Sequence, residues 1–145
     1  MSEELKTNVR KIFDEAYNQG KLEIIDDLVA DDYVRKQPPM KSVKGLDAYK
    51  KFITQIREAY SNLKISLDEV LADGDKTVAR ITLTGKHTGR TPTLHAPPTG
   101  KEISMVGCVV STWKDGKLVE DFAYNDYMGL TQQFGVVPLQ MASWE

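Results

Sequence analysis

The sequence predicts one α+β domain in which helices come first and strands follow. Apolar residues recur at helical spacings of three and four up to about residue 60, and from Asn62 the period changes to two. No repeat, low-complexity segment or Gly/Ser linker divides the chain. We therefore expect a single domain over residues 1–145, with an apolar tail at 136–145, in which three helices cover a strongly curved antiparallel sheet around an internal cavity.

The first part of the chain predicts three helices and one extended segment. A first helix ends at Gly20, a short second helix follows over residues 22–29, and a third begins near Gly45. Residues 33–37 are expected to be extended and to end at Pro38-Pro39. The apolar stripes of the two longer helices are Leu5, Val9, Ile12, Phe13, Ala16 and Tyr17, and Leu46, Tyr49, Phe52, Ile53, Ile56 and Tyr60.

The second part predicts strands joined by turns. Alternating apolar residues indicate strands around Ile65 and Ile81. Residues 105–110 are mostly apolar on both faces, which predicts a central strand buried on two sides. Asp115-Gly116 is expected to turn this strand into a last one over residues 118–126, and a short helix should follow near residues 130–134.

A loop rich in proline and glycine covers residues 89–100. Its position between two strands predicts a lid that folds over the mouth of the cavity. His95 lies within it and is either a substrate contact or an exposed loop histidine.

Charge and cysteine content exclude several classes of protein. Nineteen basic and 21 acidic residues give a net charge of −2, which argues against a general nucleic-acid binder. A single cysteine, Cys108, excludes an intramolecular disulfide framework and a zinc site built on several thiolates, and we expect it to be a small buried apolar residue. No apolar run approaches the roughly 18 residues of a membrane span. We expect a cytoplasmic protein without nucleic-acid or membrane partners.

Four blocks carry a resemblance to a known family: EAYNQGKLEIIDDLVADDYV at 15–34, GKHTG at 85–89, APPTGKEI at 96–103 and DGKLVEDFAYNDYMGLTQQFG at 115–135. In order and spacing, over about residues 8–135, the chain resembles the SnoaL-like polyketide cyclases of the nuclear-transport-factor-2-like (NTF2-like) superfamily. The resemblance implies an NTF2-like cone with a cavity inside.

The resemblance also implies a reaction, an intramolecular aldol ring closure without a metal or organic cofactor. In the family an aspartate of the last strand is the general acid/base, and a histidine of the preceding strand assists it. These positions fall on Ala123 and Val109 in this chain. A first-helix tyrosine associated with holding substrate matches Tyr17, and an asparagine of the third helix falls near Phe52. The scaffold is retained, but the acid/base pair is absent.

Asp121 is the carboxyl that the residues themselves single out. A two-residue turn at Asp115-Gly116 would pair it with Val110, whereas a three-residue turn would pair it with Val109. We prefer the second register, which places on the cavity face Val119, Asp121, Ala123 and Asn125 together with Met105, Gly107, Val109, Ser111 and Trp113. Burial there should raise the pKa of Asp121 toward that of a general base.

Each candidate side chain also has a structural alternative. Asp121 can instead pair with Arg80, Arg35 or His87, or be solvated at the rim of the sheet. His87 can steady an oxyanion or bond a loop carbonyl. Arg35 and Lys36 can receive an anionic or enolate oxygen at the cavity edge, or each can be a solvated ion-pair partner. Asp126 is expected to cap the last helix.

We therefore predict a cofactor-independent cyclase or isomerase for a small hydrophobic, polyketide-like ligand. Asp121, Tyr17 and His87 are the candidate catalytic residues. The candidate substrate-binding residues are Trp113, Tyr33, Arg35, Met105, Val109, Ala123, Phe52 and His95. The alternatives are ring closure by the shape of the pocket, a non-catalytic binding protein, or an interaction module that docks through its tail. An exposed convex sheet face predicts a homodimer.

Overall fold

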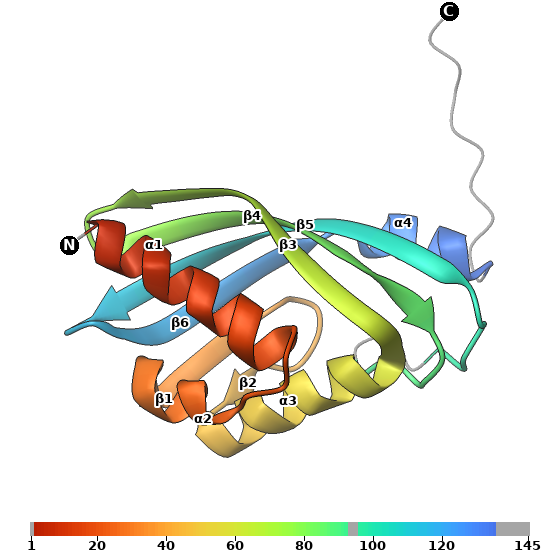
Figure 1. Ribbon diagram of the computed structural model, residues 1–145, viewed down its shortest axis with the longest axis horizontal. Helices are drawn as coiled ribbons and strands as arrows, with labels where there is room; N and C mark the ends of the chain where they lie inside the picture. The colour runs from red at the N-terminus through yellow and green to blue at the C-terminus, as the bar shows by residue number, and fades with distance from the viewer. Residues whose placement is uncertain (1, 93–95, 136–145) are drawn as a thin grey trace, which may run out of the picture.

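Three N-terminal helices cover one face of a six-stranded sheet in the computed structural model, which describes residues 2–92 and 96–135 (Figure 1). The helical elements are α1 (Ser2–Lys11), which runs into the π-helical segment η1 (Ile12–Tyr17), α2 (Glu23–Leu28), α3 (Leu46–Ala59) and α4 (Tyr127–Phe134). The strands are β1 (Val29–Lys36), β2 (Val43–Lys44), β3 (Tyr60–Asp73), β4 (Lys76–His87), β5 (Glu102–Lys114) and β6 (Lys117–Asn125). The α+β class and the order of helices and strands are confirmed.

One pair of strands departs from the antiparallel sheet that the sequence predicts. The strand order is β2-β1-β6-β5-β4-β3, and β1 runs parallel to β6, whereas the other neighbouring pairs are antiparallel. Parallel neighbours need a long crossover connection, which the chain from β2 through β5 provides. This pairing sets Arg35 opposite Asp121, so it brings two charged candidate residues together.

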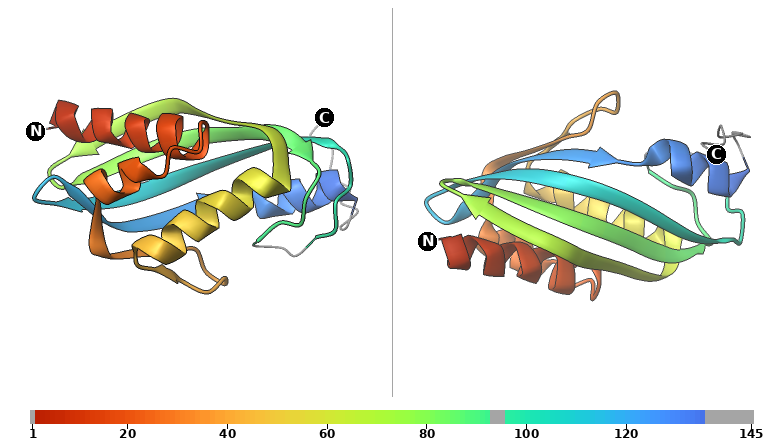
Figure 2. Two further views of the ribbon diagram at one scale, coloured as in Figure 1. Left: turned by 60° about the horizontal axis from the view of Figure 1, so that its bottom comes forward. Right: turned by 90° about the horizontal axis from the view of Figure 1, so that it is seen from above.

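The central strand β5 is buried on one face only, which corrects the prediction of burial on both. Met105 and Val109 are buried, whereas Val106 on the other face is 54% exposed. The three N-terminal helices lie on one side of the sheet (Figure 2). The apolar run over residues 105–110 predicts that both faces of the strand avoid water. It does not say whether another part of the same chain covers the second face.

The β5–β6 hairpin begins with a two-residue turn. Lys114 pairs with Lys117 across Asp115 and Gly116. Both turn residues have positive φ, 53° and 76°, which is what a tight hairpin turn of the I′ type requires. The turn predicted at Asp115-Gly116 is therefore confirmed.

A bulge after this turn changes the register from both alternatives that the sequence left open. Val119 has no partner on β5, and beyond it Ser111 pairs with Asp121. Neither predicted partner, Val109 or Val110, lies opposite Asp121. The extra residue keeps Asp121 on the predicted cavity face, while Leu118 is buried in the place expected for Val119.

The first helix is fixed on the sheet by one amide side chain. Asn18, directly after η1, donates from Nδ2 to the Ile65 carbonyl oxygen at 2.9 Å, and its Oδ1 accepts from the Ile65 N–H at 2.7 Å. This pair of bonds sets the position of the preceding residue, Tyr17, over the inner face of the sheet. No helix in the described part of the chain has both the length and the apolar character to span a membrane.

Candidate functional site

Three hollows lie in series between the helices and the sheet. An outer groove of about 470 Å³ lies between the segment after β1, β2 and α3, and Arg35, Lys51 and Phe52 are among its lining residues. An inner cavity of about 30 Å³ is lined by Phe13, Tyr17, Arg35, Phe52, Ile56, Ile65, Ile81, Leu83, Met105, Val109, Asn125 and Tyr127. A void of about 10 Å³ is lined by Val9, Ile12, Phe13, Tyr49, Ser111, Trp113, Leu118 and Asp121. The internal cavity is thus smaller than the sequence analysis predicted, because side chains fill most of the interior.

Two phenylalanines separate these hollows. Phe52 and Arg35 line both the groove and the inner cavity, with the guanidinium carbon of Arg35 4.8 Å from the centre of the Phe52 ring. Phe13 lines both the inner cavity and the void, and its ring stacks on Tyr17 at 4.9 Å. Phe52 and Phe13 thus lie between the groove, which by itself is in the usual size range of a ligand site, and the buried carboxyl of Asp121.

Arg35 is a buried cation rather than a solvated one. Its side chain projects from β1 over Phe52, the residue is 7% exposed, and its Nε has no hydrogen-bond partner among the described residues. Burial disfavours the charge, but the charge of Asp121 favours it, and the pKa of Arg35 stays above its ordinary value. The site therefore contains a permanent positive charge with one N–H available to a ligand.

Asn125 supplies a second buried polar atom without a partner in the same cavity. Its Oδ1 has no hydrogen-bond donor among the described residues, and its side chain lines the inner cavity with Arg35. Gly107 lies opposite Asn125 on β5, and a Cβ at Gly107 would collide with the Asn125 amide. Buried polar atoms are nearly always paired, so a donor and an acceptor left open in one cavity indicate a place for a polar ligand group.

Asp121 is held by two hydroxyl groups. The Tyr33 hydroxyl donates to Oδ2 at 2.7 Å, and the Ser111 hydroxyl donates to Oδ1 at 2.6 Å. Asp121 is 4% exposed, and burial raises the pKa of its carboxyl, although the charge of Arg35 and the two hydrogen bonds act in the opposite direction. A carboxyl whose pKa is raised by burial has the property that the sequence analysis expected of a general base.

Three tyrosines from three elements meet beside Asp121. The hydroxyls of Tyr17 and Tyr49 are 3.2 Å apart, and the rings of Tyr33 and Tyr49 stack at 4.3 Å. Burial is the main cause that raises the pKa of all three phenols. They remain protonated near neutral pH and act as hydrogen-bond donors. Tyr17, which lines the inner cavity, is the one that a ligand there can reach.

Most of the predicted substrate-binding residues lie around these hollows. Phe52, Met105 and Val109 line the inner cavity, and Ala123 pairs with Val109 and is buried on the same face. Trp113 lines the void and donates from its indole nitrogen to the Thr77 hydroxyl at 3.0 Å. His95 lies outside the described residues. Pro92, from the predicted lid, lines the outer groove.

His87 does not share a site with Asp121. Ser111, the partner of Asp121, pairs with Thr77, and His87 lies ten residues further along β4, roughly 30 Å at the usual rise of a strand. Its Nδ1 is 3.0 Å from the Thr99 hydroxyl, and its ring stacks on Phe134 at 4.1 Å. Burial lowers the pKa of His87. It is a neutral side chain that fastens the loop before β5 and α4.

Several structural alternatives are settled by ion pairs and caps. Arg80 pairs with Asp68 and Glu69 on the outer side of the sheet rather than with Asp121. Lys36 pairs with Glu120 at 3.2 Å, as the solvated alternative predicts. The Asp126 side chain accepts from the Gly129 N–H at 2.8 Å and caps α4. Cys108 is only partly buried, which corrects the expectation that it is a core residue.

Sequence reasoning missed three contributors to the site. Ser111 was placed on the correct face, but its bond to Asp121 depends on the bulge at Val119. Tyr49 was interpreted as core alone, since its hydroxyl contact with Tyr17 has no signature in the helix stripe. The groove beside α3 did have a signal, because residues 41–51 contain four lysines and one acid.

Comparisons with known proteins match most of the chain. The family model for SnoaL-like polyketide cyclases matches residues 7–134. No curated protein matches the sequence. A solved structure from Jannaschia sp. CCS1, a candidate SnoaL-like polyketide cyclase, superposes with a TM-score of 0.85 at 20% identity, over 94% of this chain and 95% of that one.

Two further solved structures come from Streptomyces. TsrD of Streptomyces laurentii has a TM-score of 0.82 at 24% identity, over 93% of this chain and 97% of its own. AclR of Streptomyces galilaeus, a candidate hydroxylase, has a TM-score of 0.82 at 23% identity, over 97% of this chain and 91% of its own. These similarities establish the NTF2-like fold. The reaction depends on the site, because one fold supports several chemistries.

Proposed function

Because this chain belongs to the SnoaL-like polyketide cyclase family, we propose that it is a cofactor-independent cyclase or isomerase acting on a small hydrophobic, polyketide-like molecule. The observation that carries the proposal is the inner cavity. Its lining is mainly apolar, yet it contains the open N–H of Arg35 and the open oxygen of Asn125, with the Tyr17 hydroxyl beside them. Such a cavity fits an apolar compound that carries carbonyl and hydroxyl groups.

In the proposed reaction, the Asp121 carboxylate takes a proton from a carbon next to a carbonyl group. The electron pair of the broken C–H bond moves onto the carbonyl oxygen, and the Arg35 N–H and the Tyr17 hydroxyl donate to the resulting enolate. In a cyclisation the enolate carbon attacks a second carbonyl carbon, and the proton on Asp121 passes to the new alkoxide. In an isomerisation the same proton returns to another atom of the enolate.

Entry of the substrate requires the two phenylalanines to move. Phe52 closes the inner cavity against the groove, and Phe13 closes it against the void that Asp121 lines. The Phe52 ring contacts the guanidinium of Arg35, and the Phe13 ring stacks on Tyr17. We propose that the substrate takes the place of these stacking partners as it enters.

One observation favours a second candidate function, a protein that binds a similar molecule without converting it. The positions that the family resemblance assigns to its acid/base pair are Val109 and Ala123, and both are buried apolar residues here. Without Asp121 in the proton-transfer role, the cavity would still bind a carbonyl compound through Arg35 and Asn125.

Enolisation of a simple ketone distinguishes the two functions. We expect the protein to accelerate exchange of the protons next to the carbonyl of α-tetralone in D₂O, followed by proton NMR. Native mass spectrometry of the purified protein should in addition show any bound polyketide-like metabolite. Exchange no faster than with an equal concentration of the Asp121→Asn, Arg35→Met double variant would favour a binding protein.

We also propose that the protein is a homodimer that associates through the outer face of β5 and β6. Tyr124 and Val106 on this face are 59% and 54% exposed, and Phe122 stacks on Tyr124 at 5.2 Å. Exposed apolar side chains gathered on a sheet face mark an association surface.

Light scattering at high micromolar concentration should give the mass of a dimer, and Tyr124→Lys should give a monomer. Leu71→Lys, at a residue of β3 that is 56% exposed, is the matched control, and a strict monomer in the wild type would contradict the proposal.

A further inference from the structure

We infer that the ligand of this site carries an anionic oxygen group, a carboxylate or a phosphate, which lies in the outer groove. Lys41, Lys44 and Lys51 line the groove together with the buried Arg35, and none of its described lining residues is acidic. The chain as a whole has a net charge of −2, so a hollow lined by four cations is a local departure from its composition. Such a hollow attracts anions.

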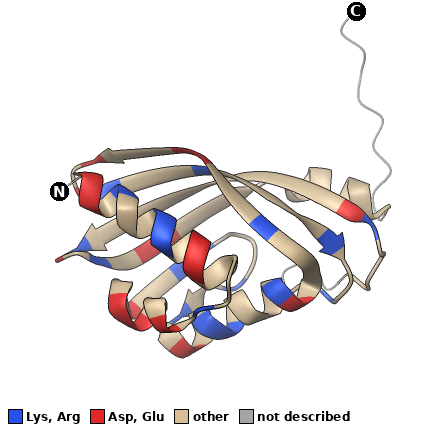
Figure 3. Cartoon of the chain, viewed as in Figure 1, with Lys and Arg blue, Asp and Glu red and all other residues tan. Residues whose placement is uncertain are grey.

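The three lysines are not used in ion pairs within the described part of the chain. Two neighbouring lysines do form ion pairs: Lys36 with Glu120 at 3.2 Å, and Lys50 with Asp26 at 2.8 Å. Lys44 on β2 and Lys51 on α3 belong to elements that pack together. Figure 3 shows several Lys and Arg positions along α3 in blue. The groove thus retains positive charge where the adjacent surface neutralises it.

Polar groups of the groove complete a site for oxygen atoms. Gln55 lines it beside the lysines, as does Gln37, whose Nε2 donates to the Tyr127 hydroxyl at 2.6 Å. Helix α3 begins there without a side-chain cap on its first N–H groups. Ala48, in that first turn, is a lining residue, whereas Asp47 is not. The positive end of the helix dipole adds to the lysine charges and favours an anion at this end of the groove.

The position of Arg35 relates the groove to the inner cavity. Its side chain lines both hollows. A ligand that spans them would place its apolar, carbonyl-bearing part inside and its anionic group outside among the lysines. The inference depends on the proposed function in one respect, that a single molecule occupies both the groove and the inner cavity.

Three naphthalene probes test the charge requirement by calorimetry. We expect 2-naphthoate and 2-naphthyl phosphate to bind with at least about ten-fold lower Kd than the neutral methyl 2-naphthoate, and more weakly as salt is added. The tighter of the two anions identifies the group as carboxylate or phosphate. Each exposed lysine should contribute about two- to five-fold to Kd. Lys41→Gln, Lys44→Gln, Lys51→Gln together should therefore raise the Kd of the anions roughly 10- to 100-fold and leave that of the ester unchanged.

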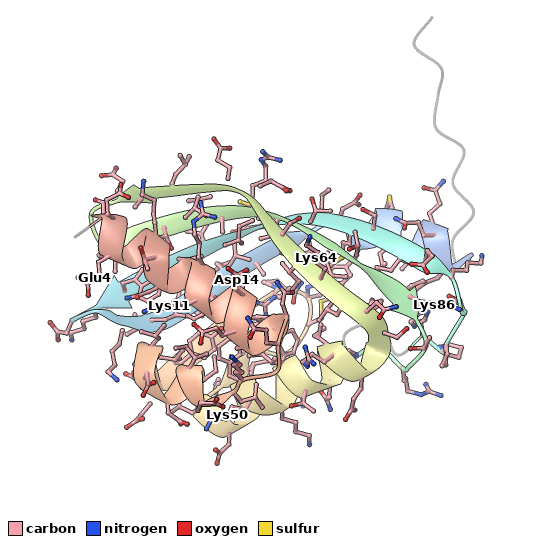
Figure 4. The ribbon with its side chains drawn as sticks, in the orientation of Figure 1. Glu4, Lys11, Asp14, Lys50, Lys64 and Lys86 are labelled. Carbon is pink, nitrogen blue, oxygen red and sulfur yellow. The ribbon has the colours of Figure 1, made fainter. Side chains whose placement is uncertain are left out.

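A matched triple variant controls for net charge. Lys64 and Lys86, labelled in Figure 4, and Lys114 are exposed on β3, β4 and β5 and do not line the groove. Their replacement by glutamine should leave all three Kd values unchanged. Equal affinity for the ester and the anions, no binding of either anion, or equal effects of the two triple variants would overturn the inference.

The two assays separate this inference from the proposed function. α-Tetralone has no anionic group, so its exchange by the wild-type protein measures the proposed reaction independently of anion binding. Exchange without preferential anion binding would overturn the inference and leave the proposed reaction in place. Preferential anion binding without exchange would support the inference and overturn the proposed reaction.

Discussion

Replacement of Asp121 by asparagine is expected to lower the rate of α-tetralone exchange by roughly 10²–10⁴-fold, the usual contribution of a general base. Asparagine keeps the shape of the side chain. Of the hydroxyls of Tyr33 and Ser111, which now donate to the two carboxylate oxygens, one can still donate to the amide oxygen, and the other can rotate to accept from the amide nitrogen. The melting temperature and the Kd of the naphthalene probes should therefore change little. Proton NMR of the exchange and a thermal melt measure the two effects.

Asp68→Asn is the matched control for this variant. Asp68 also accepts from a hydroxyl, that of Thr82 at 2.5 Å, and lies near Arg80, but it is on the outer side of the sheet. The Asp68→Asn variant should exchange the protons of α-tetralone at the wild-type rate. A large loss of stability in Asp121→Asn with an unchanged exchange rate per folded molecule would show that Asp121 is a structural residue.

Arg35→Met is expected to lower the exchange rate by roughly 10²–10³-fold, because it removes a donor to the enolate oxygen from a buried site. Methionine fills much of the same space and keeps an apolar contact with Phe52. Loss of the positive charge also removes the main influence that holds the pKa of Asp121 down. In the pH–rate profile of the exchange, the rise on the acid side (the acid limb) should accordingly lie at higher pH than in the wild type.

Arg35→Lys separates charge from geometry. Lysine restores the positive charge but cannot present the guanidinium N–H at the position of Nε. We expect the acid limb to return toward its wild-type position while most of the rate loss remains. Arg80→Met, at an arginine of the outer surface, should have the wild-type rate. A wild-type rate in Arg35→Met would remove Arg35 from the reaction.

The helices and the cavity face of the last strand from Asp121 onward could be predicted because burial imposes a period on the sequence. The stripe through Phe52 and Ile56 and the cavity face of Asp121 both follow from it. Strand direction has no such period, so the parallel pairing of β1 with β6 was not predicted. The bulge at Val119 was also missed, since no residue there requires one.

The site could be predicted only in part. Tyr17 was identified from the family resemblance, and Asp121 from its place on the cavity face of an alternating strand. Arg35 lies in a segment of mostly polar residues and was a candidate only as a cation at the edge of the cavity. His87 was assigned to the same site from its place at a strand end, but the length of β4 keeps it away. The size of the inner cavity depends on how Phe13 and Phe52 pack, and a pattern of residue types contains no information on that packing.

The pH dependence of α-tetralone exchange tests the central claim, that the buried carboxyl of Asp121 takes the proton. Exchange requires the ionised carboxylate, so the rate should rise with pH through an apparent pKa above 3.8, because burial raises the pKa of Asp121 from that ordinary value. The limb should be absent from Asp121→Asn. A wild-type limb at or below 3.8, or the same limb in Asp121→Asn, would contradict the account.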